Sequence, residues 1–255
     1  IIHGGDIIDY INNNNYNFHW NFTSGFVNDI NSMWHLYQKN LDVWNREIGN
    51  MQQMYNKETD MLHGKANSIM VELINLGILN ISDEMCFSFK NRQIKEFLMK
   101  VGNLLELFVC TSASVIKDEE GNKFFDDIRV GVNIDWDGIY HDVTDVIKDT
   151  KNEIDVILMK NNIPVFISCK SGDLNVEELY KLHTVALKFG GTKVKKVLLI
   201  SDFNKKGVAR SYYLQRAEDM DITVETDVHK YSVEDLNKLL VGLFDESEDN
   251  SEIRG

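Results

Sequence analysis

The spacing of apolar positions after residue 90 predicts alternating helices and strands. Apolar residues recur every three or four positions, as on the buried face of a helix, over 93–111, 176–189 and 206–220. Short apolar stretches typical of strands occupy 128–136, 154–158, 165–168, 197–201 and 222–226. In the first of these, alternate residues are expected to face one side of the sheet: Ile128, Val130, Val132 and Ile134. The order of elements predicts an α/β domain with a mixed sheet between helices.

Before residue 90 the pattern is helical first and strand-like afterwards. Helical spacing predicts helices over 30–57 and 65–76. Two strand-like stretches, 78–81 and 85–89, flank Asp83 and Glu84 and predict a hairpin. Two helices followed by a hairpin indicate a small winged-helix-like module. Because its second helix carries no basic face, a role as linker or dimer surface is favoured over nucleic-acid recognition.

These patterns divide the chain into three parts. Residues 1–90 are the helical, winged-helix-like module, residues 91–240 the α/β domain and residues 241–255 an acidic, disordered tail. The chain does not begin with Met, and we expect it to be part of a longer product. No apolar run approaches the ~18 residues of a membrane helix, and no secretory signal is visible. The three cysteines are far apart, so we expect reduced thiols in the cytoplasm.

Charge is distributed unevenly along the chain. Lys and Arg number 27 against 40 Asp and Glu, and the net charge of −13 argues against a general nucleic-acid binder. The window 179–216 nevertheless holds nine basic residues and one acid, Asp202. We expect the lysines of this window to follow a phosphate backbone: Lys181, Lys193, Lys195, Lys196, Lys205 and Lys206. The alternative is a solvated helix face with a lysine-rich turn. The seven histidines show no paired spacing and are expected on the surface or in packing roles.

The strongest candidate chemistry lies in two neighbouring predicted strands. Asp155 is surrounded by apolar residues in the first strand, and Lys170 follows the second strand directly. A charged carboxylate in such surroundings is costly unless it is paired or bound to a metal. The oxygen of Asp155 and the carbonyl of Cys169 are hard ligands, which favours Mg²⁺ or Mn²⁺. Lys170 is placed to orient water or to stabilise a phosphate undergoing attack.

Two further positions complete or complicate this candidate site. Glu106 is the only charged residue in a strongly apolar helical stretch and is expected to be the third catalytic and metal-binding residue; a solvent-facing role is the alternative. Ser168 stands where a second acid is expected. In one alternative the Ser168 hydroxyl and the Cys169 carbonyl suffice because Glu106 and Asp155 supply the charge, and in another the site is inactive. In a third alternative the acid has moved elsewhere, and the candidates are Glu178, Glu177 and Glu153.

Several segments together resemble the nuclease half of the CRISPR ancillary nucleases, which pair a CARF sensor domain with a PD-(D/E)XK nuclease domain. The similar segments are 102–106, 152–155, 166–172, 177–182, 189–191 and 216–217. Leu104 stands where this family has Trp. The resemblance implies a restriction-endonuclease-like (PD-(D/E)XK) fold in a homodimer.

The resemblance also implies how such an enzyme is used. In this family cyclic oligoadenylate binds the sensor dimer and activates metal-dependent cleavage in type III CRISPR antiviral defence. No run of βα repeats long enough for a sensor precedes residue 30, so the cyclic nucleotide is expected to act only through a domain outside this chain.

The sequence therefore predicts a metal-dependent endonuclease that cleaves DNA or RNA, in single strands, with little sequence specificity. Its expected catalytic residues are Glu106, Asp155, Ser168 and Lys170. One alternative is a catalytically inactive nuclease-fold module that binds nucleic acid or dimerises. Another is a restriction or junction endonuclease of the same fold, which would cut duplex DNA.

Overall fold

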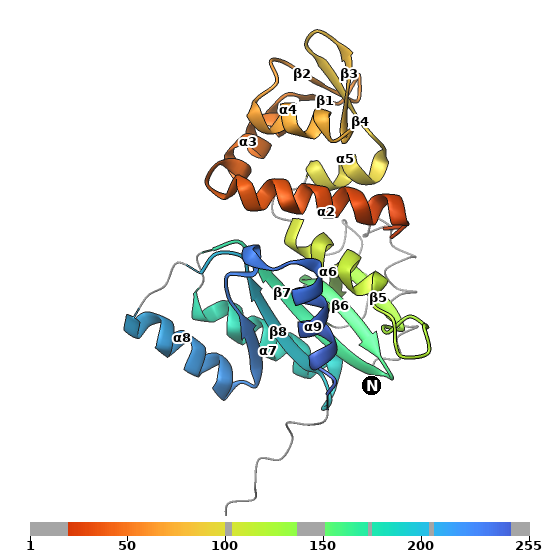
Figure 1. The fold of residues 1–255 in the computed structure, drawn as a ribbon. Coiled ribbons are helices and arrows are strands. Elements are labelled where there is room, and N and C mark those ends of the chain that lie inside the picture. The colour runs from red at the N-terminus through yellow and green to blue at the C-terminus, as the bar shows by residue number, and fades with distance from the viewer. Residues whose placement is uncertain (1–19, 100–103, 137–150, 173–174, 204–206, 246–255) are drawn as a thin grey trace, which may run out of the picture.

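The structure, a computed structural model, describes residues 20–99, 104–136, 151–172, 175–203 and 207–245. These residues form eight α-helices and two sheets, which confirms the predicted mixed α/β class. A smaller unit with a four-stranded sheet lies to one side of a larger unit with a five-stranded sheet (Figure 1). Among the described helices, none has both the length and the apolar character needed to cross a membrane.

The smaller unit begins with two helices where one was predicted over 30–57. Helix α2, Ser24–Lys39, and helix α3, Leu41–Gln53, meet at Asn40. The Asn40 side chain donates to the Leu36 carbonyl at 2.8 Å, and its own backbone has left the helical region. Asn competes in this way for backbone partners, so the helix is interrupted although the apolar spacing continues.

The small sheet has the strand order β1-β2-β4-β3 and is antiparallel throughout. The predicted hairpin is confirmed as β3, Leu79–Asp83, and β4, Cys86–Phe89. The predicted helix over 65–76 is confirmed in the shorter form of α4, Ser68–Asn75. Strands β1, Tyr55–Asn56, and β2, Met61–His63, were not anticipated because each is very short.

The helix predicted over 93–111 is also two helices. Helix α5 spans Arg92–Leu98 and α6 spans Leu104–Val115, and residues 100–103 lie outside the described part. Helix α5 already ends at Met99, its C-terminal cap, although the apolar spacing continues beyond it. Nine residues of α6 are buried, so this helix lies inside the molecule.

The larger sheet has the order β5-β6-β7-β8-β9. The strands are β5 Asp127–Asp135, β6 Lys151–Lys160, β7 Ile163–Lys170, β8 Lys195–Ile200 and β9 Ile222–Glu225. Strand β6 runs antiparallel to both β5 and β7, whereas β7, β8 and β9 are parallel to one another. The remaining elements are α7 Val176–Gly190, α8 Gly207–Asp219, the 3₁₀ turn η1 Val228–Lys230 and α9 Val233–Gly242.

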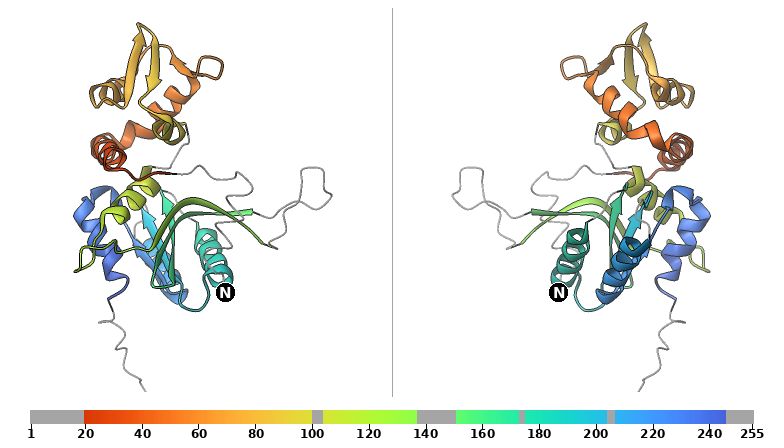
Figure 2. Two further views of the ribbon diagram at one scale, coloured as in Figure 1. Left: turned by 90° about the vertical axis from the view of Figure 1, so that its right-hand side faces the viewer. Right: turned by 90° about the vertical axis from the view of Figure 1, so that its left-hand side faces the viewer.

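Helices cover both faces of this sheet (Figure 2). On one face α6 and α9 pack against alternate residues of β7 and β8, for example Ile167 and Leu199. On the other face α7 and α8 pack against the residues between them, for example Phe166 and Leu198. The sheet is therefore buried on both sides, as its apolar strands require.

Strand β5 does not keep one face throughout, contrary to the predicted alternation. Val130 packs into the core on the α6 side, whereas Val132 packs into the core on the α7 side. Gly131 between them has φ +62°, a conformation that favours glycine. The paired residues are Val130↔Val156 and Val132↔Ile154, so the ladder omits Gly131 and Asp155. The kink in β5 thus faces the candidate catalytic Asp155.

One continuous core joins the two units. The indole of Trp34 in α2 stacks on Phe108 in α6, with ring centroids 4.1 Å apart and planes 8° apart. The same indole donates its N–H to the Tyr231 carbonyl at 3.1 Å. Both aromatic rings are almost completely buried. The smaller unit is therefore anchored through α2 to the helix that lies under the larger sheet.

Candidate active site

The candidate site lies where the β6–β7 ladder ends. Regular pairing runs from Lys160↔Ile163 to Val156↔Ile167 and stops there. Beyond it, the Cys169 backbone N–H donates to Asp155 Oδ2 at 2.7 Å, and the Ser168 hydroxyl donates to the same oxygen at 3.1 Å. The Asp155 carboxylate thus takes the place of the backbone carbonyl that a regular ladder would offer. The half-buried side chain is fixed at the point where two central strands separate.

Lys170 lies between two carboxylates. Its Nζ is 3.0 Å from Glu178 Oε2 and 4.0 Å from Asp155 Oδ2. Burial lowers the pKa of Lys170, but the attraction of Asp155 and the hydrogen bond to Glu178 outweigh burial, so the pKa is raised. The ammonium is therefore charged at neutral pH. Glu178 is in the first turn of α7, where a carboxylate also interacts favourably with the helix dipole.

These groups line one small cleft of about 30 Å³. Its polar lining includes Glu178 and Glu153, two of the three candidates for a displaced acid, and the exposed Lys181. The lining residues are Glu153, Ile154, Asp155, Ile167, Ser168, Lys170, Glu178, Lys181, Leu182 and Val185. Three carboxylates and two ammonium groups in so small a space favour a site that binds a charged ligand over a packing contact.

Glu106 is in the first turn of α6, the helix that packs on the face of the sheet opposite α7. Burial raises the pKa of the Cys169 thiol strongly, and the negative charges of Asp155 and Glu106 raise it further. Both carboxylates therefore lie near this sulfur. The residues that line the cleft include Asp155 and, in the described part of the chain, do not include Glu106. Its predicted metal-binding role stays a prediction.

The predicted basic surface is less concentrated than the sequence indicated. Lys196 is buried: its Nζ donates to the Met220 carbonyl at 2.6 Å and lies 3.4 Å from Asp221. It therefore presents no charge to a substrate, contrary to expectation, because β8 turns this side chain inward. Lys193 is exposed, and Lys195 lies over the Phe244 ring; both are at the start of β8, whereas Lys170 pairs with its end. Lys205 and Lys206 lie outside the described residues.

The donor groups of the cleft fit a hard divalent cation. Asp155 and Glu178 supply carboxylate oxygens on either side of Lys170, and Cys169 offers its carbonyl at the same strand end. Oxygen donors of this kind suit Mg²⁺ or Mn²⁺ better than Zn²⁺. The buried thiol of Cys169, whose pKa is raised, is a poor ligand by comparison.

Sequence reasoning missed Gly131, which shapes the backbone opposite Asp155. The signal was present as a glycine inside an alternating strand, which often marks a bulge or a close approach. Glu178 was only one of several candidates for a displaced acid, and its ion pair with Lys170 now distinguishes it from Glu177, whose side chain is exposed.

Comparison with known proteins shows the fold and no more. No protein-family model and no curated protein matches the sequence. The crystal structure of protein VC1899 from Vibrio cholerae matches with a TM-score of 0.60 and 17% identity over 89% of this chain. A structure of Can2 from Sulfobacillus thermosulfidooxidans in complex with cyclic tetra-adenylate has a TM-score of 0.46 and 16% identity over 82% of this chain. This chain covers 58% and 56% of those two proteins, so it spans little more than half of each.

Proposed function

We propose that this chain is a divalent-metal-dependent endonuclease that hydrolyses phosphodiester bonds. The observation that carries the proposal is the arrangement of Asp155, Lys170 and Glu178 in one cleft at the separation of β6 and β7. An acid and a lysine on neighbouring central strands, with a second acid from the helix that follows, suit phosphodiester hydrolysis. The fold expected for such an enzyme, PD-(D/E)XK, has the element order of the larger unit.

In the proposed mechanism Asp155 and Glu178 would hold Mg²⁺ or Mn²⁺, with the Cys169 carbonyl and Glu106 as further candidates. The bound cation would lower the pKa of a coordinated water and offset charge on the phosphate. Lys170, which stays protonated, would orient that water and stabilise the negative charge that grows on the phosphate during attack. The hydrogen bonds from Ser168 and Cys169 hold the Asp155 carboxylate in place.

The proposed substrate is DNA or RNA in single-stranded form. Lys181 lines the cleft, is exposed and is suited to contact a phosphate. Resemblance of the motif segments to CRISPR ancillary nucleases supports a role in type III CRISPR defence. A homodimer, with a cyclic oligoadenylate sensor outside this chain, is part of the same proposal.

A cleavage assay on labelled single-stranded DNA, single-stranded RNA and duplex DNA tests this function. The protein is incubated with Mn²⁺, Mg²⁺ or EDTA. We expect cutting that needs metal and is lost in Asp155→Asn and Lys170→Met. The exposed matched controls, Asp42→Asn and Lys57→Met, should cut like the parent protein.

The outcomes separate the alternatives. Cutting of junctions or of one palindromic duplex would favour a restriction or junction enzyme. Cutting that survives both Asp155→Asn and Lys170→Met would refute the proposed site. Binding of nucleic acid without any cutting would favour a non-catalytic module of the same fold.

A further inference from the structure

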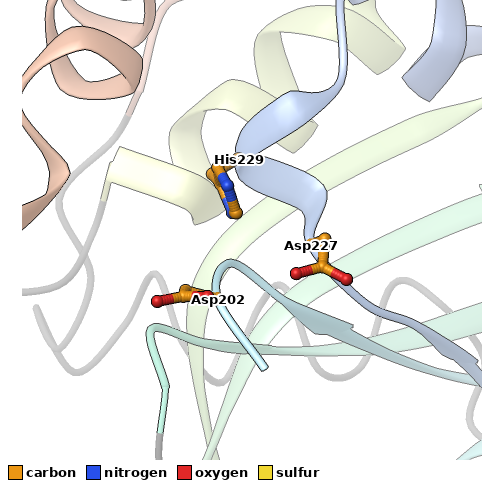
Figure 3. A group of neighbouring side chains, drawn as sticks. All are labelled: Asp202, Asp227 and His229. Atoms are coloured by element: carbon orange, nitrogen blue, oxygen red, sulfur yellow. The ribbon is translucent and has the colours of Figure 1, made fainter. Parts of the chain in front are cut away.

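A second group of ligand-bearing side chains lies beyond the carboxyl ends of β8 and β9. Asp202 follows β8 by two residues, and Asp227 and His229 follow β9. One carboxylate oxygen from each Asp and one ring nitrogen of His229 lie within 4.8 Å of one another (Figure 3). All three side chains are half-buried. They are donors at the mutual spacing that one metal ion requires, although Asp202 is remote from the others in sequence.

The topology of the sheet brings these residues together. Strands β8 and β9 are parallel and paired, from Lys196↔Ile222 to Leu199↔Glu225, so both end at the same edge. Asp227 then adopts a left-handed conformation, with φ 59° and ψ 33°, and turns the chain back into η1. The cluster therefore depends on the fold and could not be seen as a spacing motif.

The orientation of His229 is set by a group outside the cluster. Its ring Nδ1 forms a short hydrogen bond with the Ser201 carbonyl, and its backbone N–H donates to the same oxygen at 3.2 Å. A carbonyl can only accept, so the ring hydrogen is on Nδ1 and the neutral imidazole keeps its lone pair on Nε2. Metal-binding histidines are usually held in this way, with one ring N–H donated to a carbonyl or carboxylate.

The surroundings hold this histidine rigidly. The His229 carbonyl accepts a hydrogen bond from Gln38 Nε2 at 2.7 Å, and the Ser201 hydroxyl is 2.5 Å from the hydroxyl of Tyr37. Both partners belong to α2, the helix that anchors the smaller unit. A histidine fixed from two sides presents its free nitrogen at low entropic cost, as a preorganised ligand does.

The charges of the cluster also favour a cation. Two carboxylates within 4.8 Å repel each other, and a divalent ion between them would convert repulsion into attraction. Two positive groups lie close by: Lys230 Nζ is 3.7 Å from Asp227 Oδ1, and the Arg210 guanidinium donates to the Thr226 hydroxyl at 2.9 Å. That lysine is largely exposed and its ion pair is correspondingly weak. Thr226 also contacts Asp227, at 3.4 Å from Oδ2.

We propose that Asp202, Asp227 and His229 form a second divalent-metal site, selective for a transition ion such as Zn²⁺ or Mn²⁺. One nitrogen and two carboxylate oxygens are the donors that such ions accept, with room for water as a further ligand. The ion would join the ends of β8 and β9 under α2 and so stiffen the junction of the two units. This proposal does not depend on nuclease activity, because the cluster shares no side chain with the Asp155 cleft.

Calorimetric titration of tag-free protein with Zn²⁺ tests the site. The titration uses the Asp155→Ala variant, in which the first site has lost a ligand, and also the parent protein. We expect one equivalent to bind in both. Binding should weaken at least tenfold in His229→Ala and in Asp227→Asn, and stay unchanged in His63→Ala, an exposed histidine of β2. Co²⁺ absorption in the visible range would report coordination directly.

Thermal melting with and without Zn²⁺ guards against a folding artefact. Zn²⁺ should raise the melting temperature of the parent protein. The cluster variants should melt at nearly the same temperature as the metal-free parent, and Zn²⁺ should not raise it. Failure of the parent to bind Zn²⁺, or equal binding by His229→Ala and His63→Ala, would overturn the proposal. Loss of cleavage in Asp155→Asn with Zn²⁺ binding intact would instead bear on the nuclease site alone.

Discussion

The kink at Gly131 gives a prediction that links backbone conformation to the candidate site. Gly131 has φ +62° in the middle of β5, at the position that faces Asp155 in β6. A Cβ built there would meet the Glu153 Oε1 atom at 3.5 Å, which is ordinary contact. Replacement by Ala therefore has space, and its cost comes from the left-handed backbone rather than from a clash.

The expected cost of Gly131→Ala is about 1–2 kcal/mol of folding free energy, the penalty for an L-residue in the left-handed region. For a chain of this size that corresponds to a loss of about 2–8 °C in melting temperature. Gly49 is the matched control, because it lies inside α3 with no atom within 4 Å of a built Cβ. There Gly→Ala should stabilise by about 0.5–1 kcal/mol. The same Gly→Ala substitution should thus destabilise the protein at position 131 and stabilise it at position 49.

Thermal melting and cleavage assays on both variants test the argument. Relief of the strain in Gly131→Ala requires β5 to straighten, which would move the neighbouring Asp155 out of its hydrogen bonds with Ser168 and Cys169. We therefore expect metal-dependent cleavage to fall at least tenfold in Gly131→Ala and to be unchanged in Gly49→Ala. If Gly131→Ala were as stable as the parent, the left-handed kink would not exist in solution. A destabilised but fully active variant would separate the kink from the site.

Further predictions follow from the polar contacts of the cleft. Glu178→Gln should reduce cleavage and Mn²⁺ affinity at least tenfold, while the exposed neighbour variant Glu177→Gln should not, in parallel kinetic and calorimetric measurements. Lys181→Ala should weaken binding of single-stranded DNA and reduce the salt slope by about 0.7, whereas Lys193→Ala, outside the cleft, should leave binding at the cleft unchanged. The raised pKa of Lys170 predicts a stabilising contribution that is complete below the unfolded pKa, near 10.5, and is lost as pH rises through the higher folded value. In alkaline unfolding measurements, the difference in stability between the parent and Lys170→Met that comes from the lysine charge should therefore vanish only above that pH range.

The order of the larger unit could be predicted from the sequence because each element has one dominant periodicity. Strands β6 and β7 are apolar runs separated by a polar turn, and α7 keeps a clear apolar stripe. The neighbourhood of Asp155 and Lys170 follows from the pairing of consecutive strands. The same reliance on periodicity made the helices predicted over 30–57 and 93–111 too long. At Asn40, for example, the apolar spacing continues although the helical backbone is interrupted.

Other features depend on tertiary contacts that no local pattern records. Lys196 looks like a surface cation in sequence, yet β8 is buried on both faces and the side chain finds the Met220 carbonyl and Asp221. The cluster of Asp202 with Asp227 and His229 needs the parallel pairing of β8 and β9. Such groupings arise from strand order, which a single sequence specifies only through the whole fold.

The geometry offers a physical reason why Ser can stand at position 168. Its hydroxyl donates to Asp155 Oδ2, so an acid at this position would place a second carboxylate against an oxygen that already carries negative charge. Under the proposed function the second carboxylate would come instead from Glu178, which pairs with Lys170 on the side away from Asp155. The two acids are thereby separated by a cation of the chain, in a cleft that both of them line. Under the proposed function, the second acid is on helix α7 instead of strand β7 but still lines the cleft. Ser168 then orients Asp155, the carboxylate that remains on a strand.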